Sequence, residues 1–175
     1  FVELAKNVLD AGADMIELGI PFSDPLADGP VIQASSKIAL DNGVNLKDVF
    51  AYSEAISSYS KKPIILMGYA NPIRKYGLKN FFNDASNSGA KGLIVPDVPF
   101  EEYEAFFSLA GNANGLNQGL KNKLDVILLT TPTSSNERIK AIDAKSEGAS
   151  LRVINEKALV YFGPFLSSWN LRANT

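Results

Sequence analysis

The chain has 175 residues, of which 46% are hydrophobic and 21% charged, as in an ordinary globular domain with a sizeable core. Its net charge of -2 gives no electrostatic attraction to nucleic acid or to an anionic membrane. The sequence has no Cys and no His, which excludes disulfides and thiolate catalysis and leaves no metal site expected. Any acid–base chemistry must therefore use carboxylates, Lys or Tyr.

Short apolar runs alternate with segments of helical spacing along most of the chain. Near-continuous apolar character is typical of strands covered on both faces, and it predicts strands at residues 15–20, 64–67, 92–95 and 126–129. A helical repeat predicts helices at residues 1–11, 31–40, 49–58, 81–88, 101–109 and 137–145. Strands that alternate with helices form βαβ units, so we expect an α/β fold with a parallel sheet.

Two segments break this rhythm. Residues 111–122 are rich in Gly and Asn, and they predict a surface loop on the side opposite the loops that follow the strands. Residues 149–175 follow no clear period, although residues 151–154 and 158–162 have the character of strands. This tail fits either a pair of ordered strands or an atypical segment, disordered or non-native in sequence.

Glu17 is the acidic residue inside the first predicted strand. Because side chains alternate along a strand, Met15, Glu17 and Gly19 share one face, and the apolar residues between them share the other. Glu17 is thus expected to point into the interior of the fold, near the end of the strand. Burial would raise the pKa of its carboxyl group and make it a usable proton donor near neutral pH. The alternative is a core Glu that is hydrogen-bonded to backbone or water.

Two aspartates lie in the loop that follows this strand. Asp28 precedes Gly29 and Pro30 at the expected start of a helix, so it fits either a functional site or a helix N-cap. Asp24 stands in a Ser-Asp-Pro sequence, which favours a turn. Local sequence leaves the role of Asp28 open.

Polar and aromatic residues follow the next two predicted strands as well. Tyr69 fits either the lining of a pocket or an aromatic core position, and Asn71 either a bond to a loop backbone or a turn. Asp97, flanked by prolines, fits either partner binding or a helix cap. No Gly-rich phosphate-binding loop follows a strand, so nothing supports nucleotide binding.

Four sequence segments stand at or just after the ends of the predicted strands. They are ELGIPFSDPLADGPVIQ from Glu17, and MGYANP, IVPDVP and LTTPT, which begin at Met67, Ile94 and Leu129. The first resembles the hallmark segment of tryptophan synthase alpha chains, a family of (β/α)8-barrel lyases, and the other three resemble the next three strand-end motifs of that family in the same order. The resemblance covers about residues 1–148, and it implies a partial TIM barrel with parallel strands, roughly the family's strands two to five.

The resemblance implies a chemistry and roles for three residues. The family cleaves indole-3-glycerol phosphate to indole and glyceraldehyde 3-phosphate, a retro-aldol reaction of tryptophan biosynthesis. Glu17 matches the family's catalytic acid–base, which protonates the indole C3 carbon and takes the proton from the glycerol hydroxyl. Asp28 matches the carboxylate that holds the indole N–H as positive charge develops, an electrostatic stabilisation. Tyr69 matches a position that lines the substrate pocket.

The resemblance also implies a partner. Pro21, Asp24, Asn71 and Pro99 match loop positions near a tryptophan synthase beta subunit, in an expected alpha2beta2 heterotetramer. Indole would pass there to a pyridoxal phosphate site, so that cofactor belongs to the partner and this chain is expected to hold none. The sequence has neither a signal peptide pattern nor an apolar stretch long enough for a membrane span, and a cytoplasmic protein is expected.

The sequence departs from the family at both ends. The first barrel strand is expected before Phe1, and residues 149–175 lack the family's sixth strand with its pocket Tyr and its mobile Gly-Val-Thr-Gly loop. The later Gly-rich loops that bind phosphate are also missing. We therefore expect residues 1–148 to form a partial barrel with an open sheet edge, followed by an atypical tail.

These departures leave several functional interpretations. A lyase that lacks the groups anchoring the substrate phosphate is expected to have little or no activity as a fragment. Another phosphate-using barrel enzyme would carry a catalytic Lys at a strand end, and the predicted strands carry none. A truncated alpha chain could also serve only to bind the beta subunit, and a product of a faulty gene model would not fold at all.

Overall fold

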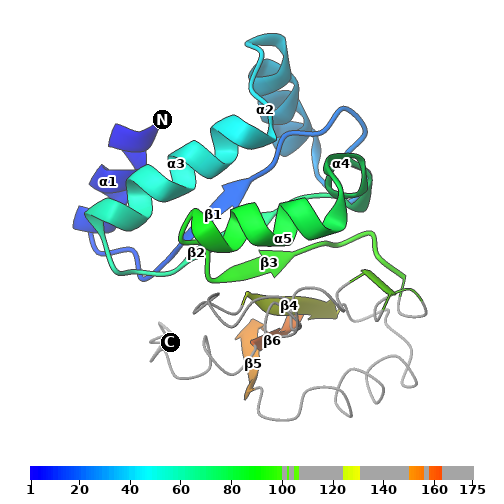
Figure 1. The fold of residues 1–175 in the computed structure, drawn as a ribbon. Helices are drawn as coiled ribbons and strands as arrows, with labels where there is room; N and C mark the ends of the chain where they lie inside the picture. The colour runs from blue at the N-terminus through cyan, green and yellow to red at the C-terminus, as the bar shows by residue number, and fades with distance from the viewer. Residues whose placement is uncertain (100–101, 103–104, 107–123, 131–149, 156–157, 163–175) are drawn as a thin grey trace.

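The computed structural model describes residues 1–99, 102, 105–106, 124–130, 150–155 and 158–162. Four strands lie parallel in the order β1 (Ile16–Gly19), β2 (Ile64–Met67), β3 (Gly92–Ile94) and β4 (Asp125–Thr130). Helices α1 (Val2–Asp10), α3 (Leu46–Tyr59) and α5 (Leu78–Asn87) lie together on one side of the first three strands (Figure 1). The predicted α/β fold with a parallel sheet is confirmed.

The core lies between these helices and the sheet. Leu18 and Ile20 of the first strand-and-loop unit are buried, as is Leu66 on β2, which pairs with Leu18 in the sheet register. Phe81 on α5 and Ile56 on α3 pack against them in the same apolar cluster. The Leu18 face of β1 therefore packs under helices, and burial of its apolar side chains stabilises the fold.

Helix α3 begins three residues earlier than its apolar pattern predicts. Asn45 accepts a hydrogen bond from the Lys47 backbone N–H at 2.9 Å, and Asp48 accepts one from the Asn45 N–H at the same distance. This reciprocal capping box satisfies backbone donors that have no partner inside the helix. The apolar repeat alone does not carry that signal.

One helix was not predicted. Helix α4 (Ala70–Tyr76) lies where Asn71 was expected to bond to a loop backbone or to form a turn. Pro72 lies in the first turn of the helix, where its missing N–H removes no intrahelical hydrogen bond and its fixed φ suits the helix. The predicted helices at residues 101–109 and 137–145 lie largely or wholly outside the described residues.

The sheet continues beyond β4 in the opposite sense. Strand β6 (Ala158–Phe162) pairs antiparallel with β4, and β5 (Ser150–Asn155) pairs antiparallel with β6. The two strands suggested for the tail are therefore confirmed. Among the described strands, the expected open edge of the sheet lies at β1. Strand β4 is not an edge, because β6 pairs with its backbone.

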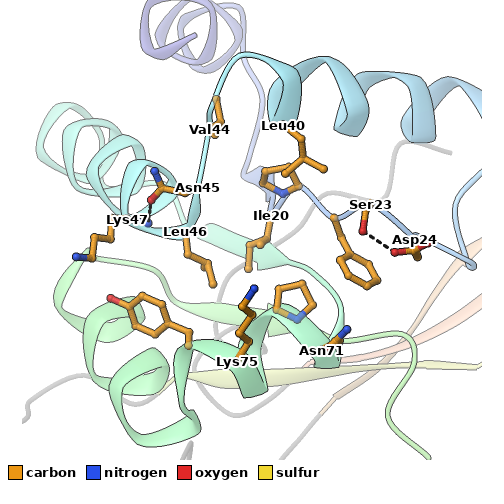
Figure 2. Close-up of a pocket in the computed structure, with 14 residues that line it drawn as sticks. Ile20, Ser23, Asp24, Leu40, Val44, Asn45, Leu46, Lys47, Asn71 and Lys75 are labelled. Atoms are coloured by element: carbon orange, nitrogen blue, oxygen red, sulfur yellow. Dashed lines mark hydrogen bonds between the residues drawn. The ribbon is translucent and has the colours of Figure 1, made fainter.

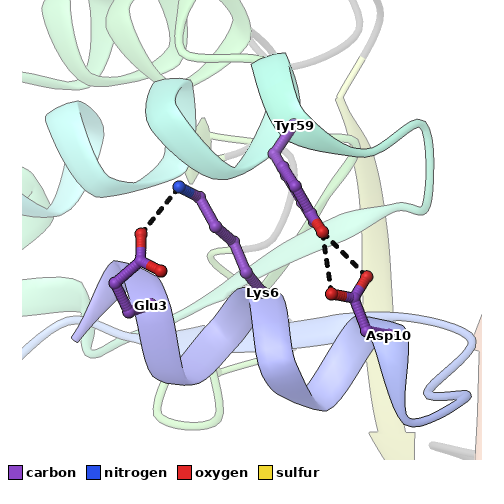
Figure 3. A network of polar contacts seen from close by, with 4 residues as sticks. All are labelled: Glu3, Lys6, Asp10 and Tyr59. Atoms are coloured by element: carbon purple, nitrogen blue, oxygen red, sulfur yellow. Dashed lines mark hydrogen bonds and ion pairs between the residues drawn. The ribbon is translucent and has the colours of Figure 1, made fainter.

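A surface network ties α1 to α3 on the outside of the core. The Tyr59 hydroxyl lies 2.8 and 2.9 Å from the two carboxylate oxygens of Asp10 (Figure 3). Lys6 pairs with Glu3 at 2.8 Å and lies over the Tyr59 ring. Both interactions are exposed to water, so they fix the helix positions more than they add stability.

Among the described residues, no helix is long and apolar enough to cross a membrane.

Candidate active site

The loops after β1, β2 and β3 meet at one edge of the sheet. Each of these strands ends at the same level of the sheet, because Met67 at the end of β2 pairs with Gly19 of β1 and with Ile94 of β3. The three segments therefore leave the sheet side by side. The Ile20 N–H donates to the Met67 carbonyl at 2.7 Å, and the Gly68 N–H donates to the Ile94 carbonyl at 3.1 Å. Side chains from three separate loops are thereby brought together at the edge where parallel sheets carry their chemistry.

Glu17 and Asp28 line the same cavity. It has a volume of about 370 Å³ and lies between β1, the loop after it, α2 (Pro30–Asp41) and the start of α3. Its remaining walls are mainly apolar and include Ile32, Val49 and Tyr52. A cavity with two convergent carboxylates and apolar walls suits a ligand with an aromatic body and a polar N–H. The sequence did place both carboxylates near one strand end, and the structure brings them to one cavity.

Glu17 is exposed, which corrects the expectation of a buried interior carboxylate. The exposure is a property of the edge strand, because Ile65, its register partner on β2, is buried. The cavity walls still displace part of the water around the carboxyl group, and this desolvation is the largest cause that raises the pKa of Glu17. The negative charge of Asp28 raises it further. Proximity to Asp28 and partial desolvation thus replace deep burial as the reason for the shift.

Asp28 does not cap α2. The N-cap of that helix is Gly29, and no side chain makes a capping hydrogen bond to it. The backbone of Asp28 is held instead, because its N–H donates to the Pro25 carbonyl at 3.0 Å and its carbonyl accepts from the Gln33 side chain at 2.8 Å. Of the two interpretations that the sequence left open for Asp28, helix capping is excluded, and its half-buried carboxylate is left to face the cavity.

Tyr69 is buried and is not among the residues lining this cavity. Its hydroxyl oxygen accepts a hydrogen bond from the Ala27 N–H at 3.1 Å, and its ring centroid lies 5.5 Å from that of Phe22. Burial is the largest cause that raises the pKa of Tyr69, and both hydrogen bonding to Asp28 and the charges of Asp28 and Asp97 raise it further. Tyr69 therefore contacts the loop that carries Asp28.

Asp97 acts as a cap for α4, a helix that precedes it in the chain. Its carboxylate accepts a hydrogen bond from the Ala70 N–H at 2.9 Å, at the start of α4. The capped helix follows the preceding strand, so the bond joins the loops after β2 and β3. Asp24 lies in the turn that its sequence favours, where it accepts a hydrogen bond from the Ser23 hydroxyl.

A second cavity, of about 640 Å³, lies on the other side of the loop after β1 (Figure 2). Three of the four residues expected near a partner line it, namely Pro21, Asp24 and Asn71; the fourth, Pro99, is exposed outside it. Sequence reasoning missed Lys47 and Lys75, which also line it. Lys75 extends from α4 toward Leu46 and Ile20. In the described part of the chain, neither lysine lies in an ion pair.

Comparison with known proteins identifies the family. Residues 1–153 match the family model of the tryptophan synthase alpha chain. The chain belongs to this family. The tryptophan synthase alpha chain of Petrotoga mobilis is 46% identical to it over 147 residues, which are 84% of this chain and 52% of that protein. The alpha chain of Microcystis aeruginosa is 47% identical over 145 residues, or 82% of this chain and 52% of that protein.

Solved structures agree with this assignment. The fold superposes on tryptophan synthase from M. tuberculosis with a TM-score of 0.72 and 33% identity, over 82% of this chain and 54% of that chain. It also superposes on the tryptophan synthase complex from Pyrococcus furiosus with a TM-score of 0.70 and 38% identity, over 79% and 53% of the two chains. The partial barrel is thus confirmed, and the chain spans about half the length of the curated relatives it matches.

Proposed function

We propose that the cavity lined by Glu17 and Asp28 is built for the family's lyase reaction, the retro-aldol cleavage of indole-3-glycerol phosphate. The observation that carries this proposal is the placement of both carboxylates in one largely apolar cavity, with the pKa of Glu17 raised. A raised pKa increases the fraction of Glu17 that is protonated near neutral pH, as a general acid requires. The chain has no His to take this role.

In the proposed reaction, the Glu17 carboxyl group donates its proton to the indole C3 carbon. The ring nitrogen then carries positive charge, and the Asp28 carboxylate accepts a hydrogen bond from its N–H and stabilises that charge. Removal of the glycerol hydroxyl proton by Glu17 lets the carbon–carbon bond break, so that indole and glyceraldehyde 3-phosphate leave. No metal or cofactor of this chain enters the scheme.

The 175-residue chain alone is proposed to have little or no lyase activity. The remote binding energy of a substrate phosphate supports catalysis, and the sequence lacks the family's later Gly-rich phosphate loops. A chimera separates the two parts of this proposal. In it, the matched segment of this chain replaces the 147 corresponding residues of the Petrotoga mobilis alpha chain. The chimera is expected to release indole, and the chain alone is not.

The role of Glu17 is tested in the same chimera. Glu17→Gln keeps the size of the side chain but cannot exchange a proton, so we expect kcat to fall by about 10²–10⁴. Equal kcat values for the chimera with and without Glu17→Gln would exclude Glu17 as the acid–base group. Indole release by the unmodified 175-residue chain at the rate of the chimera would exclude the proposed inactivity of the fragment.

A second function, binding of a tryptophan synthase beta subunit, is favoured by the larger cavity. Pro21, Asp24 and Asn71 converge there beside an apolar floor that includes Leu46 and Ile20. We propose that a beta subunit docks over this cavity in an alpha2beta2 assembly and that the beta subunit holds pyridoxal phosphate. We also propose that the protein is cytoplasmic. Co-purification of the chain with a beta subunit, without indole release, is the expected result for a chain that only binds.

A further inference from the structure

Three side chains outside the loop that carries Asp28 bond to its backbone: Ser36 at Phe22, Tyr69 at Ala27 and Gln33 at Asp28 itself. We propose that Tyr69 and Ser36 are positioning residues that clamp residues 20–29 and hold the Asp28 carboxylate across the cavity from Glu17. Neither acts on substrate in this proposal. The hydrogen bonds of this chain support the clamp itself, and the relevance of the clamp to catalysis rests on the proposed function of Asp28.

Ser36 anchors the first part of the loop. Its hydroxyl oxygen accepts a hydrogen bond from the Phe22 N–H at 2.8 Å and donates one to the Phe22 carbonyl, also at 2.8 Å. A serine hydroxyl has one donor and two acceptor positions, so a single side chain satisfies both backbone groups of one loop residue. Serine within a helix commonly bonds to the backbone of its own helix. Here the bonds run from α2 to the loop that precedes it.

Tyr69 anchors the second part of the loop. The Ala27 N–H donates to its hydroxyl oxygen at 3.1 Å, one residue before Asp28. Only 2% of the Tyr69 residue surface is exposed, so the ring has little freedom to move away. The ring also packs against Phe22, whose backbone Ser36 holds. The two anchors therefore act on the same loop from opposite ends.

Tyr69 is itself held firmly. Asp97 accepts a hydrogen bond from the Ala70 N–H next to it. On its other side, Gly68 packs so closely against the first loop that a Cβ atom there would lie 2.8 Å from Ile20 Cδ1 and 2.9 Å from Ile20 Cβ. Only glycine allows this approach, since contacts of that length force the neighbour to shift. The segment that carries Tyr69 is thus fixed to the loops after both β1 and β3.

The position of Asp28 can be measured through Glu17. The negative charge of Asp28 raises the pKa of Glu17, and this effect weakens with distance. A side-chain carboxyl ¹³C NMR titration of Glu17 in the 175-residue chain reports it directly, without any need for activity. Asp28→Asn removes the charge and sets the full size of the effect. Tyr69→Phe and Ser36→Ala each remove one anchor while residue 28 remains an aspartate.

We expect the pKa of Glu17 to fall in Asp28→Asn, and by a large part of that amount in Tyr69→Phe and in Ser36→Ala. Ser36→Thr keeps the hydroxyl and is expected to restore the original value. Tyr76→Phe and Ser57→Ala are matched controls, because these hydroxyls bond to Asp84 and to the Ser88 carbonyl, away from the loop. Both controls are expected to leave the Glu17 titration unchanged.

Two results would overturn the clamp. One is an unchanged Glu17 pKa in both Tyr69→Phe and Ser36→Ala, with a clear fall in Asp28→Asn. The other is the same fall in the controls, which would mark a general loosening of the fold. Loss of indole release from the chimera leaves this titration unaffected, so failure of the lyase proposal and failure of the clamp are read separately.

Discussion

Two cavities share one wall and carry opposite chemistry. Ile20, Pro21 and Val44 line both of them. On one side lie the carboxylates of Glu17 and Asp28; the other is lined by Lys47 and Lys75 as well as by Asp24. One short loop after β1 thus contributes to two surfaces. We propose proton chemistry for the first cavity and partner docking for the second.

The largest difference that we expect between the two cavities is in kcat, between variants of two aspartates of the same loop. In the chimera, Asp28→Asn removes the charge that stabilises the indole cation, and we expect kcat for indole release to fall on the order of 10²-fold. Asp24→Asn changes the same chemical group on the other side of the wall, and it is expected to leave kcat unchanged. Equal losses from both variants would show that the two cavities are not functionally distinct.

The shared wall is tested by Gly68→Ala. The methyl group added at residue 68 would lie only 2.9 Å from the Cβ of Ile20. We therefore expect the free energy of unfolding to fall by about 1–3 kcal/mol. Gly19→Ala is the control, since no atom lies within 4 Å of the Cβ position there. Chemical denaturation measures both, and equal stabilities would contradict the close packing of the wall.

The docking cavity is tested by charge reversal. Lys75→Glu is expected to weaken binding of a beta subunit about two- to five-fold, through the association rate, because an exposed charge at the edge of an interface contributes little. The loss should shrink at high salt. Lys61→Glu makes the same change outside the cavity and should not alter the affinity measured by titration calorimetry. An equal loss from both lysines would point to net charge alone.

The smallest effect concerns stability and pH. The folded pKa of Glu17 lies above its ordinary value of 4.5, so folding favours its protonated form. Its contribution is fully present below the unfolded pKa and is lost as the pH rises through the folded pKa. Relative to Glu17→Gln, the unmodified chain should therefore become less stable as the pH rises from about 4 toward neutrality. Parallel stability curves would contradict a raised pKa.

Much of this arrangement was predictable from the sequence, because short-range patterns carry it. Alternating apolar runs predicted the four parallel strands, and strand alternation put Glu17 on the face opposite Leu18. The position of Asp28 after that strand predicted its place at the same edge of the sheet. These features depend on period and order, which one chain displays directly.

Other features depend on contacts between distant residues and were not predictable in this way. Ser36 looks like an ordinary polar residue of a helix, and only its two bonds to Phe22 reveal an anchor. The exposure of Glu17 depends on β1 lying at the edge of the sheet. The pairing of β6 with β4 joins residues about thirty apart in sequence. The division at residue 148 stays a prediction, as do the roles assigned to individual site residues.

A titration with indole tests the central claim most directly. Amide NMR shifts of the labelled 175-residue chain would be followed as free indole is added, since the proposed site needs no phosphate to recognise the ring. The account predicts that the shifts concentrate at Glu17, Asp28 and their neighbours, and that Asp28→Asn abolishes them. Shifts that concentrate instead at Lys47 and Lys75, and persist in Asp28→Asn, would contradict it.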